Sequence, residues 1–310
     1  MKQVYLLGKL LWSDAETMVW LATTAILGLT PTWSSKSSGL DAITSASIMR
    51  PSRRQALAAA AGLSTIPSAS FAAAKPSEAE RVLQNVEWEE VPFWTKGDFR
   101  RLDESDDALF YDQPKLVLHI DDPAVKAATQ YYGRLFDEVS SRKYGERDHE
   151  LDVLDLCSSW VSHYPSGRRL GRVAGLGMNA VELDKNPILT ESVVRDLNKE
   201  PTLPYKDASF DVITCTVSID YLTSPLKVMA EAARVLRPGG VVALTISNRI
   251  FFSKAIALWT GKDDEEHIYT VGGYLHYGGS GLLAEPGVED LRPLPRGKTD
   301  PLYAIFARRL

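Results

Sequence analysis

The chain has 310 residues, of which 45% are hydrophobic and 24% are charged, and its formal net charge at pH 7 is −5. This composition supports a globular core in one large or two modest domains. The negative balance argues against a broad nucleic-acid-binding surface, and no nucleic-acid partner is expected. The two cysteines, Cys157 and Cys215, are too few for a disulfide framework or a four-cysteine zinc site, and no metal is expected.

Residues 1–75 have the composition of a targeting region, rich in Ala, Ser and Thr. Arg53-Arg54 precedes an apolar Ala/Leu run, and Ala72 and Ala74 then fit a small-x-small cleavage pattern. This order resembles a twin-arginine export signal, and the residues before it could form a plastid transit peptide. We therefore expect a chloroplast protein, with the thylakoid lumen as the destination of the two-part signal. Bacterial-type export and an alanine-rich disordered leader are the alternatives. The apolar run is shorter than the ~20 residues of a spanning helix, so the mature protein is expected to have no stable membrane span.

Residues 76–150 are expected to form a helical and aromatic lid segment. A short helix is predicted from Glu78 to Glu90. A second is predicted from Asp121 through Ser140, because Asp near the N-cap and Pro in the first turn favour a helix start and an apolar stripe follows. The aromatic residues of the segment favour packing onto a core, with a cap over a substrate pocket as the alternative.

From residue 151 the chain alternates short apolar runs with helical patterns, which predicts a parallel sheet with crossover helices. Five strands are predicted: Asp152–Leu156, Arg172–Leu176, Ser192–Arg195, Phe210–Cys215 and Val241–Ile246. The fourth is apolar at nearly every position, as expected of a strand that is buried on both faces. An amphipathic helix is predicted over Ser224–Leu236, and the Pro and Gly residues that follow favour its end.

The C-terminal region departs from simple alternation. Helices are predicted over Phe251–Trp259 and Glu266–Tyr274, and a pair of strands over Gly287–Leu294 and Leu302–Ala307. Paired glycines flank residues 274–277, which indicates a mobile segment over a pocket or, as the alternative, a structural turn.

Three stretches resemble the class I S-adenosylmethionine-dependent methyltransferases, and among them the methyltransferase type 11 group, in order and spacing. They are Val153–Leu156, Leu203–Ile213 and Val235–Gly240, and the similarity covers residues ~150–248. The run Cys157–Pro165 also resembles that of a plant, algal and bacterial subgroup. The resemblance implies an α/β fold of residues 151–310: a doubly wound, mostly parallel seven-stranded sheet of the Rossmann-like methyltransferase type, with an antiparallel last strand that Leu302–Ala307 would supply. It also implies S-adenosyl-L-methionine as cofactor and a small molecule as substrate.

The resemblance assigns cofactor-binding roles around the first strand. Asp155 stands at the acidic position that would orient the methionine ammonium of the cofactor. The glycines that follow in the family correspond to Cys157, Ser159 and Val161. This turn would therefore place side chains where the family has bare backbone.

Two further groups of residues complete the expected cofactor site. The acid that ends the family's second strand falls at Gly177, so Asn179 or Glu182 would hold the ribose hydroxyls in its place. Asp196, with Leu197 beside it, matches the position that reads the adenine amino group.

The catalytic candidates follow the fourth strand, where the family faces the transferred methyl group. Thr216 is expected beside the cofactor, Asp220 has the best position for a general base, and Tyr221 would orient the acceptor. His276 and His163 are further candidates, although a lone histidine is more often structural.

Two functions are compatible with these residues. One is a small-molecule methyltransferase with a divergent cofactor turn, which the acids at 155 and 196 favour. The other is a catalytically inactive descendant that keeps the fold as a binding or scaffold protein, which the missing glycines and ribose acid favour. The sequence does not indicate an oligomeric state.

Overall fold

The structure is a computed structural model, and it describes residues 75–294 and 297–310. The expected targeting region lies outside the described residues apart from its last residue, Lys75. Within the described ranges, no helix is both long enough and apolar enough to cross a lipid bilayer.

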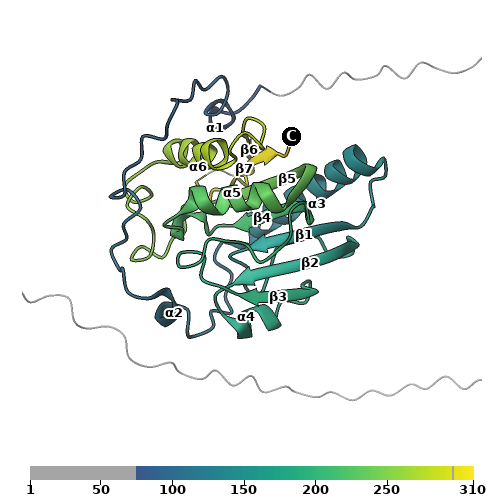
Figure 1. Cartoon of the computed structure of the whole chain (residues 1–310), viewed down its shortest axis with the longest axis horizontal. Helices are drawn as coiled ribbons and strands as arrows, with labels where there is room; N and C mark the ends of the chain where they lie inside the picture. The colour runs from purple at the N-terminus through teal and green to yellow at the C-terminus, as the bar shows by residue number, and fades with distance from the viewer. Residues whose placement is uncertain (1–74, 295–296) are drawn as a thin grey trace, which may run out of the picture. The chain divides into compact units, whose positions relative to one another are not determined.

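A seven-stranded sheet in the order β3-β2-β1-β4-β5-β7-β6 forms the centre of the described part of the chain (Figure 1). Its strands are β1 (Leu151–Leu156), β2 (Leu170–Gly177), β3 (Glu191–Val194), β4 (Phe210–Thr216), β5 (Leu236–Ile246), β6 (Gly287–Asp290) and β7 (Tyr303–Arg308). The strands from β3 to β5 pair in parallel, whereas β7 runs antiparallel to both β5 and β6. The predicted doubly wound, mostly parallel sheet with an antiparallel last strand is confirmed.

Helices cover both faces of this sheet. They are α1 (Glu78–Arg81), α2 (Asp107–Phe110), α3 (Asp122–Tyr144), α4 (Ala180–Asp184), α5 (Pro225–Val235) and α6 (Asp264–Gly278), with the short 3-10 helix η1 (Ile219–Tyr221). Because side chains alternate along a strand, β1 contributes to two cores. Leu154 and Leu156 join the core under α5 and α6, and Leu151 and Val153 join the core under α3.

Helix α3 belongs to the sheet domain, although a division of the sequence at residue 150 assigns it to the lid segment. Its side chains Tyr132 and Phe136 are fully buried in the same core as Val153. The predicted helix start is confirmed, because Asp121 caps α3 by accepting a hydrogen bond from the backbone N–H of Ala124.

Three local predictions are wrong. The helix expected over residues 78–90 is only the single turn of α1, and residues 251–259 form turns. There the backbone N–H of Ile256 donates to the carbonyl of Asp220, and Ile256 bridges to Arg101, so long-range pairing replaces a helix. Residues 274–277 are neither a mobile segment nor a turn but part of α6. A Cβ at Gly273 would lie 2.6 Å from the ring of Trp94, so glycine permits that tryptophan to pack on the helix.

The edge of the sheet at the amino ends of β1 and β4 carries a buried ion cluster. Asp211 is 1% exposed and accepts hydrogen bonds from Lys143 at 2.5 Å, Arg237 at 2.7 Å and Tyr144 at 2.7 Å. Arg237 also donates to Asp152 at 2.7 Å. These partners hold the pKa of Asp211 below its ordinary value although burial opposes them.

Candidate functional site

A cavity of about 330 Å³ opens at the opposite edge of the sheet, beyond the carboxyl ends of β1, β2 and β4. This volume lies within the roughly 300–1,000 Å³ of small-molecule and cofactor sites. Ligands of open α/β sheets bind at this edge. Its walls include Asp155, Gly177, Asp196 and Thr216 from four neighbouring strand ends and loops.

The turn after β1 is unusual because no helix follows it. Residues 157–169 connect β1 to β2 as irregular chain. Cys157 has a φ of 53°, in the left-handed region, and the backbone N–H of Ser158 then donates to the carbonyl of Leu176 at 2.8 Å. A Cβ at Gly177 would lie 2.1 Å from the carbonyl oxygen of Ser158, so the turn runs tightly over the end of β2. Glycine is therefore needed at 177, whereas Cys157 adopts the left-handed conformation without being a glycine.

Asp155 lies at the base of the cavity and is 3% exposed. Its Oδ2 accepts hydrogen bonds from the hydroxyls of Ser158 and Ser162, both at 2.7 Å, and its Oδ1 accepts one from Thr214 at 3.0 Å. Burial raises the pKa of Asp155 to about 6, and the three hydroxyls keep it from rising further. Its neighbours thus bind the carboxylate without supplying a cation.

Asn179 and Glu182, which were expected to bind the ribose hydroxyls, form hydrogen bonds within the protein instead. Asn179 caps α4 and donates from its side chain to the carbonyls of Tyr111 and Asp112, and it does not line the cavity. Glu182 does line the cavity, but its Oε1 accepts from the backbone N–H of Lys115 at 2.7 Å. Its Oε2 accepts from Ser159 at 2.5 Å. Both residues therefore hold residues 106–120, which we call the strap.

The strap forms one wall of the cavity. In Figure 1 the segment between α1 and α3 passes along the side toward which β1 and β2 point. The indole N–H of Trp160 donates to the carbonyl of Val117 at 3.1 Å, so the β1–β2 connection also contacts the strap. The aromatic residues of the segment divide between the two expected roles, packing onto the core and covering the cavity. Trp88 and Trp94 pack against α6, whereas Tyr111 lines the cavity.

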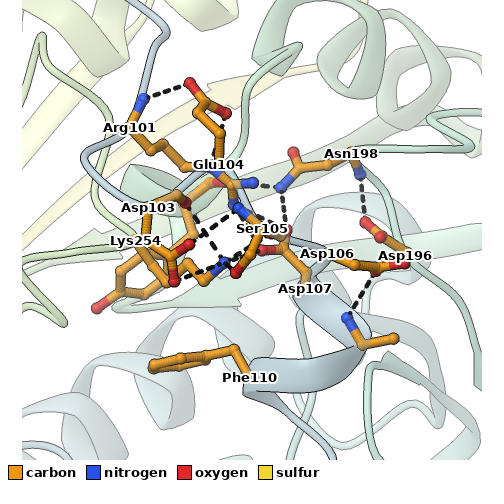
Figure 2. A network of polar contacts seen from close by, with 12 residues as sticks. Arg101, Asp103, Glu104, Ser105, Asp106, Asp107, Phe110, Asp196, Asn198 and Lys254 are labelled. Atoms are coloured by element: carbon orange, nitrogen blue, oxygen red, sulfur yellow. Dashed lines mark hydrogen bonds and ion pairs between the residues drawn. The ribbon is translucent and has the colours of Figure 1, made fainter.

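A buried polar network anchors the start of the strap (Figure 2). Asp107 accepts hydrogen bonds from Arg101 at 2.8 Å on both carboxylate oxygens. The ammonium of Lys254, which is fully buried, lies 3.2 Å from both Asp107 and Asp103. The side chain of Asn198 donates to Asp107 at 2.9 Å. The strap is thereby tied to the loop after β3.

That loop carries the expected adenine-reading residues. Asp196 and Leu197 both line the cavity. The Oδ1 of Asp196 accepts from the backbone N–H of Asn198 at 2.9 Å, and its Oδ2 lies 3.8 Å from the ammonium of Lys199. Oδ2 therefore keeps capacity to accept a further hydrogen bond.

The catalytic candidates are not brought together. Tyr221 lines the cavity, and its hydroxyl accepts from the backbone N–H of Phe251 at 2.8 Å. Asp220 is 3% exposed beside it but does not line the cavity, and burial raises its pKa to about 8. His276 lies on α6, stacked on Trp88 and 3.3 Å from Glu285, and does not reach the cavity. Thr216 lines the cavity, with its hydroxyl 2.6 Å from that of Tyr132.

Sequence reasoning gave a cap over a pocket only as the alternative for residues 76–150, because the strap carries no motif. It named His163 without ranking it above other histidines. His163 lines the cavity, and its Nδ1 is buried without a hydrogen-bond partner. Burial, aided by nearby His119, lowers its pKa to about 4, so the ring is neutral at pH 7. His163 also has a φ of 57°, in the left-handed region, which the sequence does not predict.

The cavity fits the expected cofactor in part. Asp155, Cys157, Ser159, Glu182, Asp196, Leu197 and Thr216 line it together, and Asn179 does not. The lone pair that Asp196 keeps suits a donor such as an adenine amino group. The side chains of the turn leave the cavity open rather than filling it.

Comparisons with known proteins agree with this arrangement. Residues 166–244, which span β2, β3, β4 and most of β5, match the family model described as a methyltransferase domain. A malonyl-[acyl-carrier protein] O-methyltransferase of Marinomonas sp. is 31% identical over 67 residues, which are 22% of this chain and 25% of the relative. A protein of the same description from Hahella chejuensis is 29% identical over 126 residues, 38% and 44% of the two chains. The chain thus spans less than half of the length of these relatives.

Similarity to solved structures is found at low identity. A putative S-adenosylmethionine-dependent methyltransferase from Listeria monocytogenes is 10% identical, with a TM-score of 0.42 over 60% of this chain and 99% of that chain. The central strands of the sheet thus match a methyltransferase domain, and the antiparallel direction of β7 agrees with the fold that the resemblance implied.

Proposed function

We propose that this protein transfers a methyl group from S-adenosyl-L-methionine to a small molecule. The observation that carries the proposal is the cavity at the carboxyl edge of the sheet, where Asp155, Asp196 and Thr216 converge. When bound, the cofactor would supply an electrophilic methyl group on a sulfonium. The work of the protein is then to bind, to orient the acceptor and to exclude water.

The residues of the cavity have distinct roles in this proposal. Asp155 would hold the amino-acid end of the cofactor, and Asp196 with Leu197 would hold the adenine. His163 lines the cavity with a neutral imidazole, which can share a hydrogen bond with a hydroxyl acceptor and so orient it. Asp220 would act through Tyr221, because its carboxyl lies behind the cavity wall.

Calorimetric titration of the full chain with S-adenosylhomocysteine tests the proposal. We expect binding, and Asp196→Ala should weaken it by about 1–3 kcal/mol through a lost hydrogen bond. Asp207→Ala is a matched control, because that acid is 79% exposed and lies outside the cavity. Absence of heat at millimolar ligand would refute cofactor binding, and an unchanged affinity in the Asp196 variant would refute the adenine assignment.

A catalytically inactive binding or scaffold protein is the second candidate, and one observation favours it. Asp155 already accepts three hydroxyl hydrogen bonds. A cofactor ammonium would have to share or displace them. Binding of S-adenosylhomocysteine together with no methyl transfer to any tested small-molecule acceptor would favour this candidate.

The location of the protein is a separate proposal that rests on sequence. The twin arginine and the small-x-small pattern of residues 1–75 support export through a plastid into the thylakoid lumen. A fluorescent fusion of the full chain, compared with its Arg53→Lys, Arg54→Lys variant, tests it. Identical distributions of the two fusions would contradict a twin-arginine route.

A further inference from the structure

The cationic side chains that line the cavity differ in how they are neutralised. Three lysine or arginine residues line it: Lys115, Arg195 and Arg249. Arg195 lies 3.1 Å from Glu200, and Arg249 lies 2.7 Å from Asp300. For Lys115, no carboxylate of the described residues lies within the 4.0 Å of an ion pair. Its charge is therefore left for another partner.

Aromatic rings hold the Lys115 ammonium in place. Its Nζ lies 4.3 Å from the ring centroid of Phe110, 5.2 Å from that of Tyr111 and 5.9 Å from that of Phe251. Nζ also donates one hydrogen bond to the carbonyl of Phe110 at 2.7 Å. An ammonium has three donors, so two are left over. Cation–π contacts orient a charge without cancelling it.

The charged and titratable groups nearby do not supply the missing partner. Glu182 lines this wall, but its two oxygens accept from the backbone N–H of Lys115 and from Ser159. Asp107, which also lines the cavity, pairs with Arg101 and Lys254. His119 lines the cavity edge-on to Phe251, and burial lowers its pKa although Glu182 opposes this. The wall formed by Lys115, His119 and Phe251 is therefore aromatic and keeps one positive charge.

We propose that Lys115, with the rings of Phe110 and Phe251, forms an anion subsite of this cavity that takes a carboxylate group. The inference rests on the proposed function, which supplies the two molecules that could carry this carboxylate. The carboxylate belongs either to an aromatic acid that is the methyl acceptor, whose ring would lie against Phe251, or to the amino-acid end of the cofactor. Both sources require the same chemistry, a charge-assisted hydrogen bond from Nζ inside an aromatic wall.

Matched pairs of ligands separate the sources in calorimetric titrations of the full chain. The first pair is 4-hydroxybenzoate and its neutral methyl ester. The second pair is S-adenosylhomocysteine and 5′-methylthioadenosine, which lacks the amino-acid end. Each is titrated into the wild type, Lys115→Met, Lys115→Arg and Lys227→Met. Lys227 is the control, because it is exposed on α5 and does not line the cavity.

We expect Lys115→Met to weaken the charged member of one pair at least tenfold and to leave its neutral partner unchanged. Lys115→Arg should restore much of the affinity, and Lys227→Met should have no effect. Loss confined to 4-hydroxybenzoate identifies the acceptor, and loss confined to S-adenosylhomocysteine identifies the cofactor. Equal affinities in wild type and Lys115→Met, or no binding of either charged ligand by the wild type, would overturn the subsite.

The same titrations distinguish this failure from failure of the proposed function. If the wild type binds 5′-methylthioadenosine and Lys115→Met changes nothing, the cofactor site stands and the subsite falls. If the wild type binds neither adenosine ligand, the proposed function fails, whatever 4-hydroxybenzoate shows.

Discussion

Buried aspartates at the two edges of the parallel sheet have opposite electrostatic environments. At the amino edge, Asp211 is surrounded by Lys143 and Arg237 and has a lowered pKa. At the carboxyl edge, Asp155 and Asp220 are equally buried, no cation pairs with either in the described chain, and both have raised pKa values. The first arrangement stabilises the fold. The second buries unpaired acids at a cost in stability, as is common at functional sites, and of the two only Asp155 lines the cavity.

Breaking the amino-edge cluster should have the largest effect. Asp211→Asn leaves Lys143 and Arg237 facing a neutral group. Removing one partner of a buried ion pair costs roughly 3–5 kcal/mol, and we expect about 3 because the two cations are 17% and 31% exposed. Urea unfolding at pH 7 measures the change. A lowered pKa gives stability above the unfolded value, so the cost should shrink as the pH falls below about 4.

The exposed pair of Asp207 and Arg234 provides the control for this change. Asp207→Asn should alter the free energy of unfolding by less than about 1 kcal/mol, because Asp207 is 79% exposed. An equal loss in both variants would mean that burial of the cluster at Asp211 is unimportant.

The same substitution at the carboxyl edge should have the opposite sign. The pKa of Asp220 is raised from 3.8 to about 8 by burial, so its stability contribution is full below pH 3.8 and is lost as the pH rises to about 8. Between these values the wild type should lose slightly more than about 1 kcal/mol per pH unit relative to Asp220→Asn, which is roughly 3 kcal/mol from pH 5 to pH 7. Urea unfolding at several pH values measures the slope. Parallel pH profiles of the two proteins would show that Asp220 is ionised in the fold.

The contrast also shows what the sequence could predict. Apolar runs at fixed spacing specified β1, β4 and β5, because burial on both faces leaves a local signature. The position of Asp155 at the end of the first strand followed from the same pattern. Of the cavity walls in the described chain, this pattern predicted only the parts that are ends of strands.

The remaining site depends on contacts between distant segments, which leave no local pattern. Glu182 and Asn179 were expected beside the ribose, but their partners are backbone groups of the strap 67 and 68 residues earlier, at Lys115 and Tyr111. His276 depends on how α6 packs against Trp88. Helical spacing in residues 251–259 was overridden by the bridge between Ile256 and Arg101.

A pair of glycines, one at each edge, separates packing from ligand binding. In Gly240→Ala the new Cβ would lie 2.6 Å from the carbonyl oxygen of Asp211, and in Gly177→Ala it would lie 2.1 Å from that of Ser158. Each overpacked variant should lose about 1–3 kcal/mol of stability. Only Gly177→Ala should also weaken the binding of S-adenosylhomocysteine measured by calorimetry, because it moves the turn beside Asp155. Equal affinities in the two variants would place the ligand elsewhere.

The smallest expected effect tests whether hydroxyls alone hold the carboxylate of Asp155. Ser162→Ala removes one hydrogen bond to Asp155 and one from Asn186, which should cost about 1 kcal/mol. The hydroxyl favours the ionised acid, so its loss raises a pKa already near 6. A raised pKa costs stability as the pH increases, so the loss should be greater at pH 8 than at pH 5, whereas the Asn186 contribution is the same at both. A loss that does not change with pH would mean that Ser162 serves Asn186 alone, and Asp155 would then be held at this edge by Ser158 and Thr214.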